Sequence, residues 1–194
     1  MESLAEQISS CKRCDLSSSR IRTVPGEGPA PCRVILVGEG PGRKEDESGR
    51  PFVGRAGAIL SSLLSDIGMS REEVFITSVV KCRPPGNRAP KRDEIASCMP
   101  YLDRQIALLS PKVMVPMGRV ATMAIFGRYG LPFHSFKDVR GKAFRVRLEK
   151  SGQEIQVIPV YHPAVITHNP PALKDLKEDF QKLEECLKKC RDIH

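Results

Sequence analysis

Three continuous apolar runs, each bounded by turn residues, predict strands that are buried on both faces of a sheet. They lie at 33–38, 73–80 and 112–118, and none shows the polar alternation of a half-exposed strand. Further β structure is expected near the end of the chain, at 143–148 and 154–161. The helices expected around these strands cover about 1–10, 56–68, 92–109, 119–127 and 175–190.

The alternation of strands with helices predicts an α/β fold. We expect a three-layer α/β/α sandwich whose central, mostly parallel sheet has four strands, and a single domain over residues 1–194. Pro100 predicts a kink or break in the 92–109 helix. Ligands of such sheets bind beyond the carboxyl ends of the strands. The segments that follow 33–38 and 73–80 are therefore the expected location of a site.

The charge balance suits a polyanionic partner. The chain has 31 Lys and Arg against 23 Asp and Glu, a net charge of +8, which fits DNA but also fits a basic surface without a partner. No apolar run approaches the length of a membrane span, and the polar start of the chain, with its early acids, does not resemble a signal peptide. We expect a cytoplasmic monomer that makes no membrane contact and whose cysteines stay reduced.

Four of the seven cysteines are expected to ligate one metal centre. Cys11 and Cys14 form a C-x2-C pair, and Cys82 and Cys98 bracket a loop rich in Pro and Arg. The alternative is four unrelated buried thiols. Ligand count does not separate zinc from an iron–sulfur cluster, and the spacing by itself slightly favours zinc.

The other three cysteines are expected to have packing or surface positions. Cys32 opens the first strand and resembles a small hydrophobic residue of the core. Cys186 and Cys190 are four residues apart on the last helix, where packing or surface positions are favoured over metal binding.

The segment 38–57 is the most informative part of the chain, with six glycines and two prolines in twenty residues. Its glycine spacing does not match a dinucleotide fingerprint, and the Gly-Lys-Ser/Thr of a phosphate loop is absent. Glu45, Asp46 and Glu47 would also repel phosphate. The segment is instead typical of a loop that surrounds a small neutral group, with glycine N–H groups and Phe52 as an aromatic wall.

Three motifs together resemble the family 4 uracil-DNA glycosylases, the iron–sulfur branch of their superfamily. They are GEGPG…ED…GRPFVGRAG in 38–57, VVKCRPPGNRAP at 79–90 and YHPA at 161–164, and the similarity runs from about residue 3 to 183. The resemblance implies a DNA repair enzyme that flips uracil out of DNA and hydrolyses its N-glycosidic bond, leaving an abasic site. It also implies a 4Fe–4S cluster held in a subregion of about 1–20 and 80–100. The ligands that match the family are Cys11, Cys14, Cys82 and Cys98.

The resemblance assigns roles in the base pocket. Phe52 stands where the family stacks a ring on the uracil, which must leave the duplex to be reached. His162 is expected to donate to uracil O2 and stabilise the charge of the departing base, although a structural histidine is the simpler alternative. Glu39 is expected to orient the attacking water or stabilise a cationic sugar. His134, His168 and His194 have no such context and are expected at the surface.

Other pocket residues follow from the same motifs. Gly40, which replaces the aspartate of better-known uracil glycosylases, and Pro41 are expected to contact the base through their backbone. Glu45 is a candidate gatekeeper against the methyl group of thymine, and Asn87 is a candidate for holding water or DNA. The 86–95 stretch lacks the histidine by which a related branch traps uracil covalently, so turnover is expected.

One position departs from the family. Ser78 stands where the family normally has asparagine, whose amide can accept from uracil N3–H and donate to O4. This substitution puts strict uracil specificity in doubt. It leaves open a non-catalytic or altered-specificity binder of deaminated bases, and a metalloprotein of another class, such as an electron carrier, is a third hypothesis.

Two segments are expected to contact DNA that contains uracil. Arg83 and Arg88, in the loop between Cys82 and Cys98, would meet backbone phosphates. In the loop 163–171, Val165 and Ile166 are candidate wedges beside the flipped base.

Overall fold

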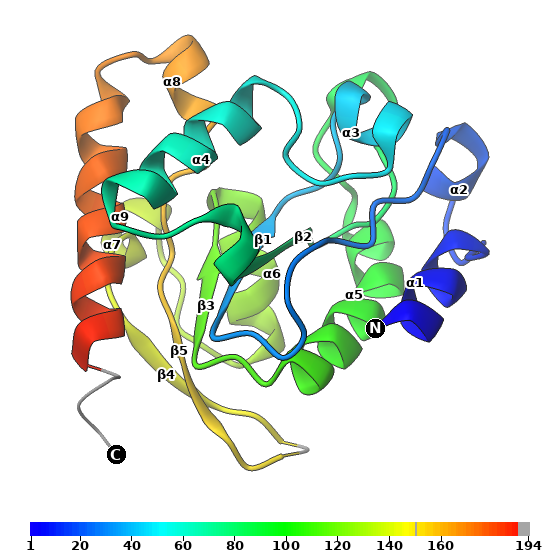
Figure 1. The fold of residues 1–194 in the computed structure, drawn as a ribbon. Helices are drawn as coiled ribbons and strands as arrows, with labels where there is room; N and C mark the ends of the chain where they lie inside the picture. The colour runs from blue at the N-terminus through cyan, green and yellow to red at the C-terminus, as the bar shows by residue number, and fades with distance from the viewer. Residues whose placement is uncertain (150, 190–194) are drawn as a thin grey trace.

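The computed structural model describes residues 1–149 and 151–189, and these form an α/β fold around a central sheet (Figure 1). The sheet has five strands in the order β2-β1-β3-β5-β4. The first four strands in this order run parallel to one another, and β4 pairs antiparallel with β5. The strands are β1 Val34–Gly38, β2 Val74–Ser78, β3 Val113–Pro116, β4 Phe144–Arg147 and β5 Glu154–Val157.

The expectation of four strands is wrong by one. The 143–148 segment, which the sequence predicts as β structure, joins the central sheet as the edge strand β4. Only Val146 of β4 is buried, whereas β1, β2 and β3 are buried throughout. A short, half-exposed strand has little hydrophobic signal of its own, and pairing with β5 decides its place.

Helices cover both faces of the sheet, as a three-layer sandwich requires. Alternate residues of β1 point to opposite layers: Ile35 and Val37 pack in a core with α1, α5 and α6, and Val34 and Leu36 pack in another with α4 and α9. The helices are α1 Glu2–Ser9, α2 Leu16–Ser19, α3 Arg43–Ser48, α4 Arg55–Asp66, α5 Arg92–Leu109, α6 Arg119–Arg128, α7 Phe136–Val139, α8 Val165–His168 and α9 Ala172–Lys189, with short 3-10 turns at Arg71–Glu73 and Pro85–Asn87.

Pro100 does not break α5, which runs unbroken from Arg92 to Leu109. Pro100 and Ala96 are both exposed, so the carbonyl that loses its helical partner can face water. Cys32 and Cys186 are buried in the two cores, as packing positions would be. Cys190 and His194 lie outside the described residues. No helix in the described ranges is long and apolar enough to cross a membrane.

Register places the carboxyl ends of three strands at one edge. Gly38, the last residue of β1, is level with Ser78, the last residue of β2, and Val37 is level with Pro116 of β3. The chain therefore leaves β1 and β2 side by side, and the loops that follow them meet there.

Candidate active site

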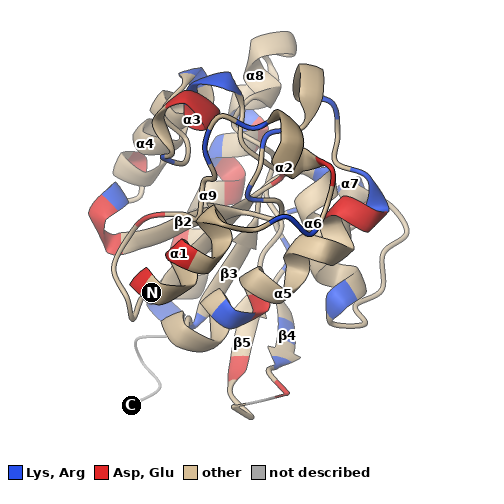
Figure 2. Ribbon diagram, turned by 90° about the vertical axis from the view of Figure 1, so that its right-hand side faces the viewer, with Lys and Arg blue, Asp and Glu red and all other residues tan. Residues whose placement is uncertain are grey.

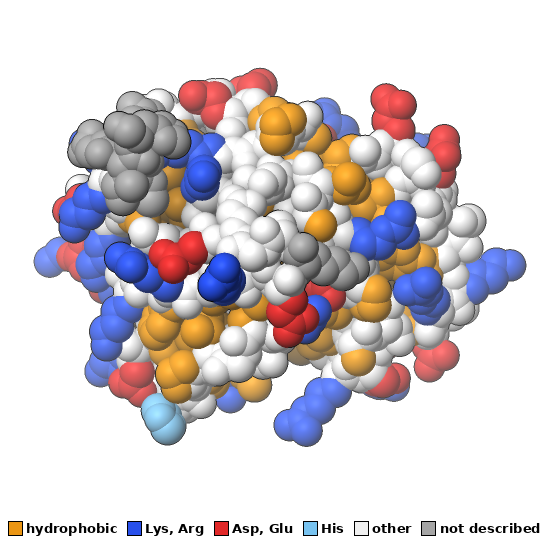
Figure 3. Space-filling model, turned by 90° about the horizontal axis from the view of Figure 1, so that it is seen from below, with side chains coloured by type: hydrophobic (Ala, Val, Ile, Leu, Met, Phe, Trp, Pro, Cys, Tyr) orange, Lys and Arg blue, Asp and Glu red, His pale blue; other side chains and the backbone are white. Residues whose placement is uncertain are grey.

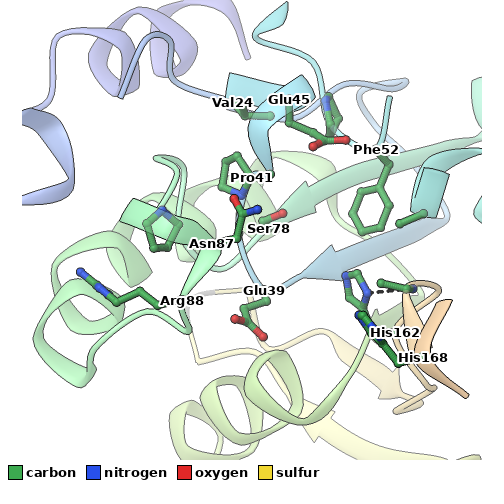
Figure 4. Close-up of a pocket in the computed structure, with 16 residues that line it drawn as sticks. Val24, Glu39, Pro41, Glu45, Phe52, Ser78, Asn87, Arg88, His162 and His168 are labelled. Atoms are coloured by element: carbon green, nitrogen blue, oxygen red, sulfur yellow. Dashed lines mark hydrogen bonds between the residues drawn. The ribbon is translucent and has the colours of Figure 1, made fainter. Parts of the chain in front are cut away.

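A cavity of about 460 Å³ lies at the carboxyl ends of β1 and β2. It brings together residues from segments far apart in the sequence, including every residue that the motifs assigned to the base pocket (Figure 4). Those residues are Glu39, Gly40, Pro41, Glu45, Phe52, Ser78, Asn87 and His162. Two further lining residues, Arg88 and His168, were expected elsewhere: the first at DNA phosphates and the second simply at the surface. His168 is indeed exposed, but it stands at the cavity.

The Phe52 ring forms one wall of the cavity and is held in a demanding backbone conformation. Its φ is +52°, a left-handed value that costs a non-glycine residue about 1–3 kcal/mol. Arg71 secures this turn, because its Nη1 donates to the Phe52 carbonyl and its Nη2 to the Pro51 carbonyl, both at 2.9 Å. A Cβ at Gly57 would collide with the same Phe52 carbonyl, so only glycine fits there. Sequence motifs gave no sign of Arg71, which acts from a different segment.

Two other contacts determine where the Phe52 ring lies. A Cβ at Gly38 would stand 2.9 Å from two ring carbons, so the missing side chain lets the ring cover the end of β1. Glu45 Oε1 accepts hydrogen bonds from the backbone N–H groups of Val53 and Gly54, both at 2.9 Å. Glu45 thus anchors the residues that follow Phe52. Its gatekeeper role stays a prediction.

His162 faces the Phe52 ring across the cavity, with ring centroids 5.6 Å apart and planes inclined by 33°. The backbone N–H of Ala164 donates to His162 Nδ1 at 3.1 Å, the dashed contact in Figure 4. Burial lowers the pKa of His162 to about 4. The imidazole is therefore neutral near pH 7, and because Nδ1 accepts, its proton is on Nε2. The site thus holds a neutral N–H donor.

The backbone at Tyr161, next to His162, is held by a buried carboxylate. Asp179 of α9 accepts the Tyr161 N–H at 3.0 Å through Oδ2, and Arg140 Nε lies 3.3 Å from Oδ1. The Arg140 guanidinium also lies over the Tyr161 ring, 4.6 Å from its centroid. Burial raises the pKa of Asp179 to about 6. No sequence motif includes Asp179, although an aspartate on the apolar stripe of an amphipathic helix is a signal that indicates such a group.

Glu39 and Ser78 complete the inner part of the cavity. Glu39 follows β1 directly, and burial raises the pKa of its carboxyl. In the view of Figure 4 its carboxylate lies between Arg88 and His162. Ser78 is buried at the end of β2, and its hydroxyl lies 3.2 Å from the point where a Gly38 Cβ would stand. One carboxylate and one hydroxyl therefore share a site with the neutral imidazole.

The loop after Cys82 is more internally bonded than expected. Arg88 makes a two-point ion pair with the buried Glu94, with distances of 2.6 and 2.8 Å. Arg83 Nε donates to Asn87 Oδ1 at 2.8 Å. The guanidinium of Arg88 therefore stabilises the loop. Arg83 has donors left over from its bond to Asn87 and is the better candidate of the two for binding a DNA phosphate. Contact of either arginine with DNA stays a prediction.

The two candidate wedges begin the short helix α8. Val165 and Ile166 are half-buried, and Ile166 packs against the core that α4 and α9 share. Ile166 is thus partly used for packing, which leaves Val165 the freer of the two. Entry of either side chain into DNA stays a prediction.

The four cysteines of the expected metal centre line one small cavity. Its lining includes Ile8 of α1, Ser17 of α2 and Tyr101 of α5. Helices α1 and α5 lie side by side (Figure 2). Two donors reach sulfur atoms: Arg20 Nη1 to Cys82 Sγ at 3.2 Å, and the Lys81 backbone N–H to Cys98 Sγ at 3.3 Å. Burial raises the pKa of the Cys98 thiol to about 11 and that of Cys82 in the same direction. Among the described residues, no three His, Cys, Asp or Glu side chains are grouped to hold a single metal ion.

Comparison with known proteins identifies the family. The family model of the uracil DNA glycosylase superfamily matches residues 25–188. The chain belongs to this superfamily. A type-4 uracil-DNA glycosylase of Sulfurisphaera tokodaii is 48% identical, over 95% of this chain and 84% of the relative. Type-4 enzymes of Archaeoglobus fulgidus and Thermotoga maritima are 42% and 40% identical, each over 97% of this chain and 94% and 95% of their own. The resemblance drawn from the motifs to the type-4 branch of the superfamily is confirmed.

Proposed function

We propose that this chain excises uracil from DNA by hydrolysing the N-glycosidic bond, leaving an abasic site. The observation that carries the proposal is the pairing of the Phe52 ring with the neutral His162 imidazole across one cavity. A planar base that stacks on Phe52 presents its edge to the Nε2–H donor of His162. Such a base must leave the duplex first, because its edge and its glycosidic bond are inaccessible in the stack.

The chemistry follows from where charge develops. As the bond breaks, the uracil leaves as an anion with negative charge on O2. His162 donates to that oxygen more strongly in the transition state than in the substrate, which lowers the barrier. A neutral donor suits this task, since it need not lose or gain a proton. Glu39 orients the attacking water or stabilises the positive charge on the deoxyribose. Gly40 supplies no carboxylate, so leaving-group stabilisation carries most of the catalysis.

We propose that Cys11, Cys14, Cys82 and Cys98 hold a 4Fe–4S cluster. The four thiols line one cavity, and four cysteine thiolates are the ligand set of such a cluster. The likeness to type-4 enzymes supports the cluster over zinc, which the ligand set by itself does not separate. When bound, the cluster joins the start of the chain, the segment after β2 and α5. Its role is structural, because hydrolysis of a glycosidic bond moves no electrons. Iron and sulfide analysis of the purified protein tests the assignment, and stoichiometric zinc would refute it.

DNA is the partner that the charge supports. The chain carries a net charge of +8. Among the described residues, the face at the end opposite the cavity has Lys and Arg interspersed with Asp and Glu (Figure 3). We propose that DNA lies over the cavity, between α8 and the loop that holds Arg83. The monomeric state, the cytoplasmic location and the single-domain organisation stay predictions.

The decisive experiment uses an oligonucleotide with one uracil, followed by alkali, which breaks the strand only at an abasic site. The wild-type chain yields a cut strand. His162→Asn loses about 100-fold or more in rate, as expected for removal of a donor to a developing anion. His134→Asn, at an exposed histidine, is the matched control and retains full activity. A wild-type chain that binds the oligonucleotide without making an alkali-labile product would contradict the proposal.

Ser78 favours a second candidate, a binder or glycosylase for another deaminated base. Its buried hydroxyl can donate or accept, so it does not impose the pattern of uracil alone. Parallel assays on uracil, hypoxanthine, xanthine and thymine mismatches separate the candidates. A rate on hypoxanthine or xanthine above that on uracil would replace the first proposal with the second.

A further inference from the structure

Lys81 is a wholly buried lysine whose side chain returns to the end of β2. Its Nζ donates three hydrogen bonds, to Thr77 Oγ1 at 2.6 Å, to the Ser78 carbonyl at 2.7 Å and to Gln105 Oε1 at 2.6 Å. These three partners satisfy all the donors of an ammonium group. All of them are neutral, so the hydrogen bonds leave the positive charge without a counter-ion.

The cysteine site adjoins Lys81. Within residues 1–149 and 151–189, no carboxylate makes a hydrogen bond or ion pair with the Lys81 ammonium, whose three partners are all neutral. The Lys81 backbone N–H donates to Cys98 Sγ, and Cys82 is the next residue along the chain. Lys81 also lines the cavity that the four cysteines share. A buried cation is costly unless an anion compensates it, and four metal-bound thiolates would do so.

The same residue also supports the base pocket. Through its Nζ it holds the carbonyl of Ser78, whose side chain lines the active-site cavity. Through its own carbonyl it accepts the backbone N–H of Val24 at 2.8 Å, and Val24 is another lining residue. One side chain and its backbone therefore touch the walls of both cavities.

We propose that Lys81 is a positioning residue that couples the four-cysteine site to the base pocket. Its ammonium supplies the counter-charge for the thiolate cluster, and its hydrogen bonds hold the Ser78 end of β2 where it meets the base. The inference rests on the proposed function, because it takes the cysteines as cluster ligands and the cavity as a uracil site. Groups just outside the ligand shell tune a cluster in this way.

Lys81→Met tests both halves of the proposal, because it keeps the length of the side chain and removes its charge and donors. Loss of a nearby positive charge makes addition of an electron less favourable, so the cluster's reduction potential moves to a more negative value. Binding of free uracil, measured by calorimetry, weakens about tenfold, the effect of roughly one lost hydrogen bond and a loosened Ser78. Lys112→Met, at an exposed lysine before β3, changes neither quantity.

Thr77→Val separates the effect of the Lys81 charge on the cluster from the effect of its hydrogen bonds on the base pocket. It also keeps the proposal testable if the Lys81 variant does not fold. It removes one acceptor of the Lys81 ammonium but leaves the charge in place. The affinity for uracil therefore falls about threefold, which corresponds to part of the free energy of one hydrogen bond. The reduction potential of the cluster stays at the wild-type value. An unchanged uracil affinity in Thr77→Val, or an unchanged potential in a folded Lys81→Met, would overturn the inference. A wild-type protein that has a cluster but no uracil affinity would instead refute the proposed function.

Discussion

Ser78→Asn tests how the pocket recognises its base. Asparagine would offer uracil an acceptor for N3–H and a donor for O4, where serine offers one hydroxyl. Position 78 is 3% exposed and faces the cavity of about 460 Å³. The Phe52 ring fills the space beside Gly38, the neighbour across the sheet, so a longer side chain at 78 extends into the cavity. A buried neutral hydrogen bond contributes about 0.5–1.5 kcal/mol, so two give about 1–3 kcal/mol and a gain in kcat/KM of roughly 5- to 150-fold.

The assay is single-turnover excision from duplexes that carry one uracil or, as a counter-substrate, one cytosine. Ser78→Asn is expected to raise the uracil rate and leave cytosine untouched, since the amide matches only uracil. Ser78→Ala, the control that removes the hydroxyl, is expected to lose about fivefold or more on uracil, the value of one hydrogen bond. If both variants match the wild type, the side chain at position 78 does not contact the base, and this account of specificity is wrong.

Four further expectations concern the ring, the imidazole and the metal centre. Arg71→Met removes two charge-assisted hydrogen bonds from the strained turn at Phe52, and also the ion pair of Arg71 with Glu27. The value of kcat/KM on uracil should therefore fall tenfold or more, and the protein should lose about 3–6 kcal/mol of stability; a wild-type rate and melting curve would contradict this. Because the pKa of His162 is about 4, the ratio of wild-type to His162→Asn kcat/KM should be constant between about pH 5.5 and 8, whereas a step near the ordinary value of 6.5 would show that the imidazole titrates in the site. In the folded protein this pKa lies below its unfolded value, so wild-type stability relative to His162→Asn should fall as pH drops from 6.5 towards 4, as measured by urea denaturation. Cys98→Ser should lose visible absorbance and lower Tm, with protease cleavage in residues 1–20; full iron content would exclude Cys98 as a ligand.

The amino-acid sequence by itself determined the parts of this protein that depend on local pattern. The strands β1, β2 and β3 were predictable because a strand buried on both faces must be apolar along its whole length. The glycine content of the 38–57 loop indicated an unusual backbone conformation. The motifs around Phe52 and His162 predicted the pocket residues, which the fold brings to one cavity. The spacing of Cys11 and Cys14 likewise indicated a metal centre from one turn of chain.

Tertiary structure alone decided which distant residues hold that site in place. Arg71 reaches the Phe52 carbonyl from nineteen residues away, and Asp179 holds the Tyr161 backbone from eighteen. Arg88, which resembled a free DNA contact, is bound by Glu94 because the loop folds back on α5. These partners meet through the topology of the sheet and its covering helices, and no short-range periodicity encodes them. The residues that carry the chemistry can therefore be identified from the sequence. The contacts that orient them form only in the folded protein.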